Sequence, residues 1–109
     1  VEAALEYPHD LALSSDSSLL FVCELYCIRA LDLTATPPTI STVYQSDYGL
    51  GGIALIPDGS GLIVALHSRH LLVEVLLPAQ RSGELAESKA VAGTGEPGCL
   101  VSDEYALSS

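Results

Sequence analysis

Residues 51–65 read GGIALIPDGSGLIVA, two short β-favouring runs with a turn between them. Pro57 presets a turn-compatible φ, Asp58 can bond its own backbone, and Gly59 accepts a positive φ. The flanking runs are rich in Ile, Leu and Val, which favour extended backbone. This stretch therefore predicts a strand, a tight turn and a second strand of an antiparallel sheet.

The same pattern occurs once more, 42 residues upstream, as LALSSDSSLLFVC at positions 11–23. Residues of matching character recur at this offset: Leu11 and Ile53, Ala12 and Ala54, Asp16 and Asp58, Ser18 and Ser60, Val22 and Val64. A repeat of this length is typical of architectures in which each unit is one supersecondary element. We therefore expect two copies of one β-unit.

Each copy contains four strand-favouring segments separated by turn residues. The expected strands cover residues 11–14, 19–23, 28–33 and 39–45 in the first copy, and 53–56, 62–66, 71–77 and 88–92 in the second. Pro37 and Pro38 place a loop before the fourth strand, because proline cannot donate to a ladder. The pattern predicts an all-β fold, with about two four-stranded antiparallel blades of a β-propeller.

Further motifs are ALEYPHDLA at 4–12, Asp16 with LFV at 20–22, the run 28–33, and VAGTGEPG at 91–98. These motifs resemble those of NHL-repeat propellers and their six-bladed, gluconolactonase-like relatives. The resemblance implies part of a six-bladed ring, with blade one at about 8–48, blade two at about 49–92, and a lead-in to a further blade at 93–109. The family usually has an Asp after the second strand, whereas Glu24 and Leu66 stand there in this chain.

The composition excludes two classes of partner. Fourteen acidic against four basic residues give a formal net charge of −10, which repels nucleic-acid phosphates and anionic membrane surfaces. No apolar run approaches the roughly 18 residues of a membrane-spanning helix. The sequence starts at Val1 without an initiator Met or a signal-peptide pattern, so we expect a mature or excised segment. A basic partner or a cation suits this charge better.

Three cysteines, Cys23, Cys27 and Cys99, leave two interpretations open. They contain no C-x-x-C pair, which gives zinc or thioredoxin-like chemistry little support. They are either three reduced thiols or include a Cys23–Cys27 disulfide across a hairpin, which requires close, opposed Cα atoms.

Blade topology brings the loop before the first strand and the loop between the second and third strands to the same edge of each sheet. The candidate binding residues at this edge are His9, Asp10, Glu24, Tyr26, Asp47, Tyr48, His67, Arg69 and His70. Their imidazoles and carboxylates suit metal binding or general-base chemistry, or else ordinary hydrated loops. No recognised catalytic spacing accompanies them, so we assign no catalytic residue, metal ligand or cofactor. The GTGEPG run at 93–98 lacks a following Lys-Ser/Thr and is interpreted as a turn.

Two functions fit this pattern. The first is a non-catalytic scaffold that binds a protein or a small-molecule ligand at the loop edge. The alternative is part of a metal-dependent propeller hydrolase or lyase, with its metal in the central channel. His9 and Asp10 could reach such a channel, but the equivalent residues 49–52 of the second copy offer no ligands, which favours binding. Two blades leave apolar faces uncovered, so we expect the remaining blades of a longer chain, or self-association of about three copies, to complete a ring.

Overall fold

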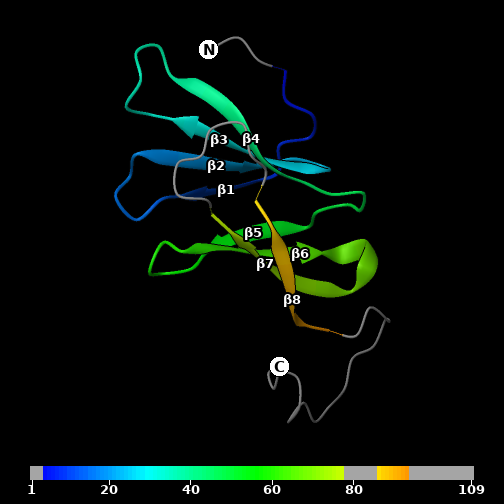
Figure 1. The fold of residues 1–109 in the computed structure, drawn as a ribbon. Helices are drawn as coiled ribbons and strands as arrows, with labels where there is room; N and C mark the ends of the chain where they lie inside the picture. The colour runs from blue at the N-terminus through cyan, green and yellow to red at the C-terminus, as the bar shows by residue number, and fades with distance from the viewer. Residues whose placement is uncertain (1–3, 78–85, 94–109) are drawn as a thin grey trace.

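The computed structural model describes residues 4–77 and 86–93, which form two four-stranded antiparallel sheets (Figure 1). Sheet A contains β1 (Asp10–Leu13), β2 (Leu19–Cys23), β3 (Cys27–Asp32) and β4 (Thr39–Gln45). Sheet B contains β5 (Gly52–Leu55), β6 (Gly61–Leu66), β7 (Leu71–Leu76) and β8 (Ser88–Ala92). A 3-10 turn, η1 (His67–Arg69), joins β6 to β7. No helix in the described ranges is long and apolar enough to cross a membrane.

The expected all-β architecture with two four-stranded antiparallel sheets is confirmed. The strands β2, β4 and β8 have the predicted bounds, and β6 and β7 differ from the prediction by one residue at one end. The strands β1, β3 and β5 begin and end one residue earlier than predicted. For example, β1 ends at Leu13 because the hydroxyl of Ser14 accepts hydrogen bonds from the turn amides of Ser18 and Leu19. The expected turn at 93–98 and lead-in at 93–109 extend outside the described residues.

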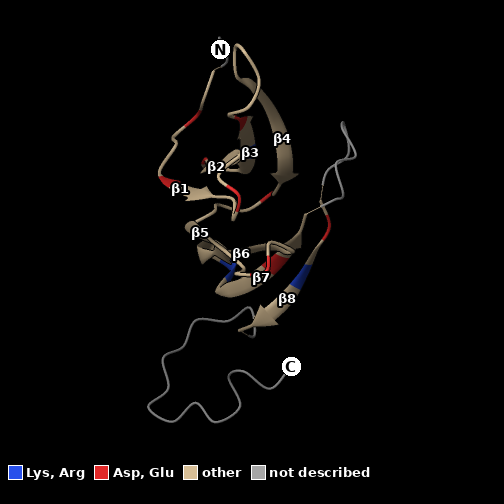
Figure 2. Ribbon diagram, turned by 90° about the vertical axis from the view of Figure 1, so that its left-hand side faces the viewer, with Lys and Arg blue, Asp and Glu red and all other residues tan. Residues whose placement is uncertain are grey.

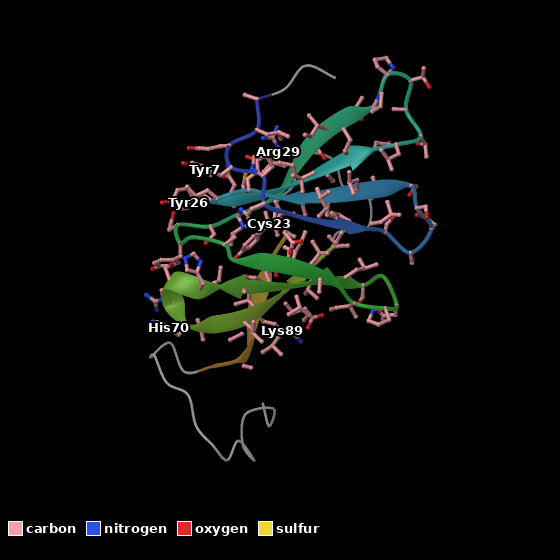
Figure 3. All side chains as sticks on the ribbon, turned by 180° about the vertical axis from the view of Figure 1, so that it is seen from behind. Tyr7, Cys23, Tyr26, Arg29, His70 and Lys89 are labelled. Atoms are coloured by element: carbon pink, nitrogen blue, oxygen red, sulfur yellow. The ribbon has the colours of Figure 1, made fainter. Side chains whose placement is uncertain are left out.

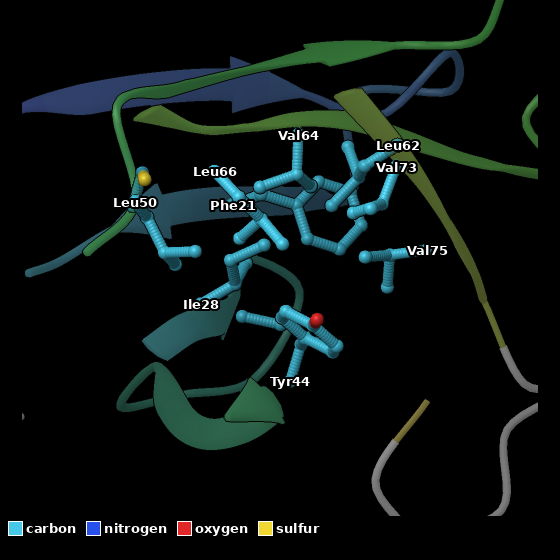
Figure 4. Packing of buried hydrophobic residues seen from close by; sticks show 11 residues of the cluster. Phe21, Ile28, Tyr44, Leu50, Leu62, Val64, Leu66, Val73 and Val75 are labelled. Carbon is cyan, nitrogen blue, oxygen red and sulfur yellow. The ribbon is translucent and has the colours of Figure 1, made fainter. Parts of the chain in front are cut away.

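The two sheets pack face to face around one apolar core. Strand pairing places Phe21 beside Ala30 on one face of sheet A, and Val64 beside Val73 on one face of sheet B. These faces meet in a cluster of buried residues (Figure 4): Phe21, Cys23, Ile28, Ala30, Tyr44, Leu50, Leu62, Val64, Leu66, Val73 and Val75. Leu50, in the link between the sheets, fills the core at the loop end.

The two sheets stack front to back: the face of sheet B that packs against sheet A is equivalent, in the repeat, to the outer face of sheet A. Val64 of sheet B is fully buried against sheet A. Its counterpart Val22 lies on the opposite face of sheet A from the shared core, alongside Leu11 and Arg29. The face that sheet B presents to sheet A therefore corresponds to the face that sheet A turns outward.

The first strands of the two sheets, β1 and β5, are neighbours across the interface (Figure 1). The carboxylate of Asp10 accepts a hydrogen bond of 2.8 Å from the backbone N–H of Ile53. On the side of the fourth strands, the N–H of Ala86 donates to the carbonyl of Val43 at 2.7 Å. Polar contacts on both sides of the apolar core therefore fix the relative position of the sheets.

Candidate binding edge

The predicted loop edge is a connected structure made from four segments at one end of the sheets. These segments are residues 6–10, 24–26, 46–51 and 67–70. The amide of Leu25 donates to the carbonyl of Glu6 at 3.2 Å, and the amide of Leu50 donates to the carbonyl of Leu25 at 2.9 Å. Labelled side chains from three of the segments, Tyr7, Tyr26 and His70, lie toward the same end of the molecule in Figure 3. Backbone hydrogen bonds thus tie the entry of sheet A to the entry of sheet B.

Tyr48 and Arg69 form the most defined surface contact of the loop edge. The guanidinium carbon of Arg69 lies 4.7 Å from the centre of the Tyr48 ring, and Nη1 lies 3.5 Å from the tyrosine hydroxyl. Both side chains are exposed. This cation–π contact joins the loop before β5 to η1, although the two residues are far apart in sequence.

His67 packs against a glycine-rich backbone. A Cβ atom at Gly49 would lie 3.1 Å from Cε1 of His67, and one at Gly51 would lie 3.3 Å from Cβ of His67. The two glycines therefore let the loop approach the imidazole closely. His70 ends η1 with φ of 57°, a left-handed conformation. The H-x-x-H sequence thus spans a tight turn, in which His67 packs against the glycine backbone and His70 ends the turn.

His9 bridges the backbone and the thiol of Cys23. Its Nδ1 lies 2.9 Å from the carbonyl of Tyr7, which only accepts, so Nδ1 carries the proton. Its Nε2 lies 3.6 Å from Sγ of Cys23, and the thiol also donates to the carbonyl of Glu24 at 3.7 Å. Burial, with a further contribution from the Asp10 carboxylate, raises the pKa of Cys23 to about 11. The thiol is protonated at neutral pH, so this pair is not an activated nucleophile.

The hairpin disulfide interpretation is wrong for this structure, since Cys23 and Cys27 are both free. Cys23 pairs with Ile28 across the hairpin, so both point into the core. Cys27 precedes Ile28 by one residue and therefore points to the other face of the sheet. Cys99 lies outside the described residues.

Asp10 is engaged by the backbone of both sheets. One carboxylate oxygen accepts from the N–H of Leu11 at 2.9 Å, and the other accepts from Ile53. An open hollow of about 460 Å³ lies beside it, lined by Pro8, His9, Asp10 and Leu11. The two side chains that sequence reasoning offered for a channel site, His9 and Asp10, thus reach Cys23 and Ile53 instead.

Glu24 lies within the loop edge but is only 3% exposed. Its carboxylate lies 3.4 Å from Nη1 of Arg29, accepts from the N–H of Glu6 at 3.1 Å, and accepts from the Cys27 thiol at 3.5 Å. Burial, followed by the charge of Glu24, raises the pKa of Cys27. This carboxylate anchors the segment before β1 and has little surface to offer a ligand.

Of the candidates named from the sequence, seven are exposed: His9, Tyr26, Asp47, Tyr48, His67, Arg69 and His70. Sequence reasoning missed Tyr7, which is 72% exposed and adopts a left-handed φ of 55°. Its position directly before Pro8 and His9, in the loop entering the first strand, is the signal that could have found it. Within residues 4–77 and 86–93, no group of three or more His, Cys, Asp or Glu side chains is placed to hold a metal ion.

No model of a known protein family matches this chain, and no curated protein matches it significantly in sequence.

Proposed function

We propose that this chain is a segment of an NHL-like β-propeller and acts as a non-catalytic scaffold that binds a protein partner at its loop edge. Support for the propeller arrangement comes from two four-stranded antiparallel sheets that stack front to back with their first strands adjacent. Propeller blades are four-stranded sheets of this kind, arranged around a central channel. In such an arrangement the loop edge is one face of the ring.

The observation that carries the binding role is the concentration of exposed tyrosine and arginine at this edge. Tyr7, Tyr26 and Tyr48 are 72%, 49% and 42% exposed, and Arg69 lies over Tyr48. Tyrosine and arginine are enriched at protein interfaces and among the residues that contribute most to affinity. The opposite ends of the sheets carry Ser-, Asp-, Pro- and Gly-containing turns, whose side chains serve the turns themselves.

The charge of the chain defines the expected partner more closely. A formal net charge of −10 attracts a basic segment and accelerates its association at low salt. Tyrosine rings provide apolar area, and their faces also accept arginine or lysine side chains. We therefore expect the partner to present basic residues next to aromatic or apolar ones.

Selection from a random peptide library displayed on phage tests this proposal. Peptides enriched on the wild-type chain are synthesised, and their affinities are measured by fluorescence anisotropy. The double variant Tyr26→Ala/Tyr48→Ala should weaken binding about tenfold or more, because it removes two exposed interface-type side chains. A matched variant at the opposite edge, Ser15→Ala/Pro57→Ala, should leave the affinity close to that of wild type.

Two results would contradict the proposal. One is a set of selected peptides that binds the tyrosine variant as tightly as wild type. The other is enrichment no greater than on an unrelated acidic protein of similar size. Raising the salt concentration should weaken binding by the expected basic peptides, since the attraction is between exposed charges.

A further inference from the structure

The face of sheet A that points away from the shared core, its outer face, is apolar and incompletely covered. Strand pairing places Leu11, Leu13, Leu20, Val22 and Leu31 on this face. Leu11 is 59% exposed and Leu13 is 47% exposed. The exposed part lies along β1, whereas the loop end is occupied by the segment that Glu24 anchors.

Sheet B also has an outer face, on the side opposite the core. It carries Ala54, Ile63, Ala65, Leu72 and Leu76. Leu72 and Leu76 are each 41% exposed. Both sheets therefore leave large apolar side chains in water, on faces that point in opposite directions from the molecule.

These two outer faces correspond to the two halves of the interface that already exists within the chain. The outer face of sheet A has its counterparts on the buried face of sheet B: Leu11 and Ile53, Leu13 and Leu55, Leu20 and Leu62, Val22 and Val64. The outer face of sheet B has its counterparts on the buried face of sheet A: Ala54 and Ala12, Ile63 and Phe21, Ala65 and Cys23. The chain therefore leaves uncovered one face of each of the two kinds that meet in its core.

The charges on the outer faces do not oppose such a contact. On sheet A, Arg29 lies 3.4 Å from Glu24. On sheet B, Lys89 of β8 lies 3.8 Å from Glu74 of β7, visible as blue next to red in Figure 2. Each face thus pairs its charges locally, although the chain as a whole is strongly acidic.

We propose that the outer face of sheet A binds the outer face of sheet B of a second copy of this chain, so that the stacking within the chain continues between chains. The inference rests on the blade-like stacking in the proposed function. Such a contact uses different surfaces on the two copies and closes into a ring when the rotation between copies allows it.

The contact between copies is weaker than the contact within the chain. Asp10 clamps β1 to the N–H of Ile53 inside the chain. Gly52 occupies the corresponding position of sheet B and has no carboxylate to extend to the next copy. Assembly should therefore depend on protein concentration while each copy stays folded.

Sedimentation velocity of the full 109-residue chain and two face variants tests the inference. Leu13→Glu places a charge on the outer face of sheet A, and Leu76→Glu places one on the outer face of sheet B. Wild type should form oligomers as its concentration is raised, and each variant alone should be monomeric. A mixture of the two variants should give a dimer and nothing larger, since one intact face of each kind remains. Tyr26→Glu, at the loop edge, is the matched control and should assemble as wild type does.

Three results would overturn the inference: a wild-type monomer at all concentrations, single variants that still assemble, or a mixture that stays monomeric. Circular dichroism and a cooperative melt verify that each variant folds, and Leu11→Glu or Leu72→Glu replaces one that does not. The peptide-binding assay separates this inference from the proposed function. A monomer that binds selected peptides at the loop edge overturns the assembly alone, whereas an oligomer that binds none overturns the binding role alone.

Discussion

Sheets A and B have the same strand order and a common turn pattern, yet equivalent positions in them have different surroundings. Phe21 in β2 is 1% exposed, because sheet B covers it. Ile63, 42 residues later in β6, is only partly buried, because it lies on the outer face. Burial of a residue in this repeat therefore depends on whether another sheet covers its face, and not on its strand alone.

A second difference separates the outer face of sheet A from its equivalent, the buried face of sheet B, and lies at the end of each face next to the loop edge. Sheet B places Leu66 and Val73 there, and both are buried in the shared core. Sheet A has Glu24 and Arg29 at these positions, joined as an ion pair beneath the segment before β1. A face covered by a sheet is thus apolar throughout, whereas a face covered by a single segment uses a carboxylate to hold that segment.

The largest difference in stability is expected between alanine substitutions at the equivalent positions Phe21 and Ile63. Phe21→Ala should lower the free energy of unfolding by about 3–5 kcal/mol, because it opens a cavity between the sheets. Ile63→Ala should cost about 1 kcal/mol, since part of its side chain is already in water. Urea denaturation measures both, and equal losses would contradict front-to-back stacking.

The ion pair of sheet A gives the next largest expected effect. Glu24→Ala should destabilise the chain by about 2–3 kcal/mol, because Arg29 is left partly buried without its partner. The double variant Glu24→Leu/Arg29→Val, which copies the sequence of sheet B, should recover part of this loss. Thermal melts compare the three proteins. A double variant as unstable as Glu24→Ala would show that the carboxylate is needed for more than neutralising Arg29.

The clamp between the first strands should have an intermediate effect. Asp10→Ala should cost about 1–2 kcal/mol, because the N–H of Ile53 loses a charge-assisted hydrogen bond in a partly buried place. Amide hydrogen exchange should become faster at Ile53 than in wild type. Asp10→Asn retains an acceptor oxygen and should lose less. Asp47→Ala, at an exposed position, serves as the control and should change neither quantity.

Substitutions in the first turn of each sheet should have the smallest effect on stability, and this effect appears only at acidic pH. Hydrogen bonds from Ser18 and Ser14 lower the pKa of Asp16 from 3.8 to about 2, and bonds from Ser60 lower the pKa of Asp58. Because both folded-state values lie below the unfolded value, the stabilisation is present above about pH 4 and declines as pH falls toward 2. Asp16→Asn should reduce this acid sensitivity more than Asp58→Asn. Melting temperatures measured across this range provide the test, and equal effects would contradict the difference between the turns.

The strands could be predicted from sequence because local chemistry determines them. Pro57, Asp58 and Gly59 specify the turn, and the flanking apolar runs specify the strands on either side. The grouping of the loops at one edge follows from antiparallel connectivity, so Tyr26 and Tyr48 could also be placed there in advance. These features require no knowledge of how one sheet meets the other.

The roles of Asp10, Glu24 and His67 could not be predicted in this way, because each depends on a segment distant in sequence. Asp10 bonds to Ile53, Glu24 bonds to Glu6 and Arg29, and His67 packs on Gly49 and Gly51. In the sequence, Asp10, Glu24 and His67 are simply polar residues near turns. Their contacts become visible only once the sheets are stacked and the loops are interlocked.

Nuclear Overhauser contacts of the Phe21 ring test the front-to-back stacking most directly, since this ring lies at the centre of the shared core (Figure 4). In a dilute sample, in which the chain is monomeric, the ring protons should show contacts with methyl groups of Leu62, Val64 or Val73 on the buried face of sheet B. Contacts from Phe21 to Ile63 or Leu72 would place the other face of sheet B against sheet A and contradict front-to-back stacking.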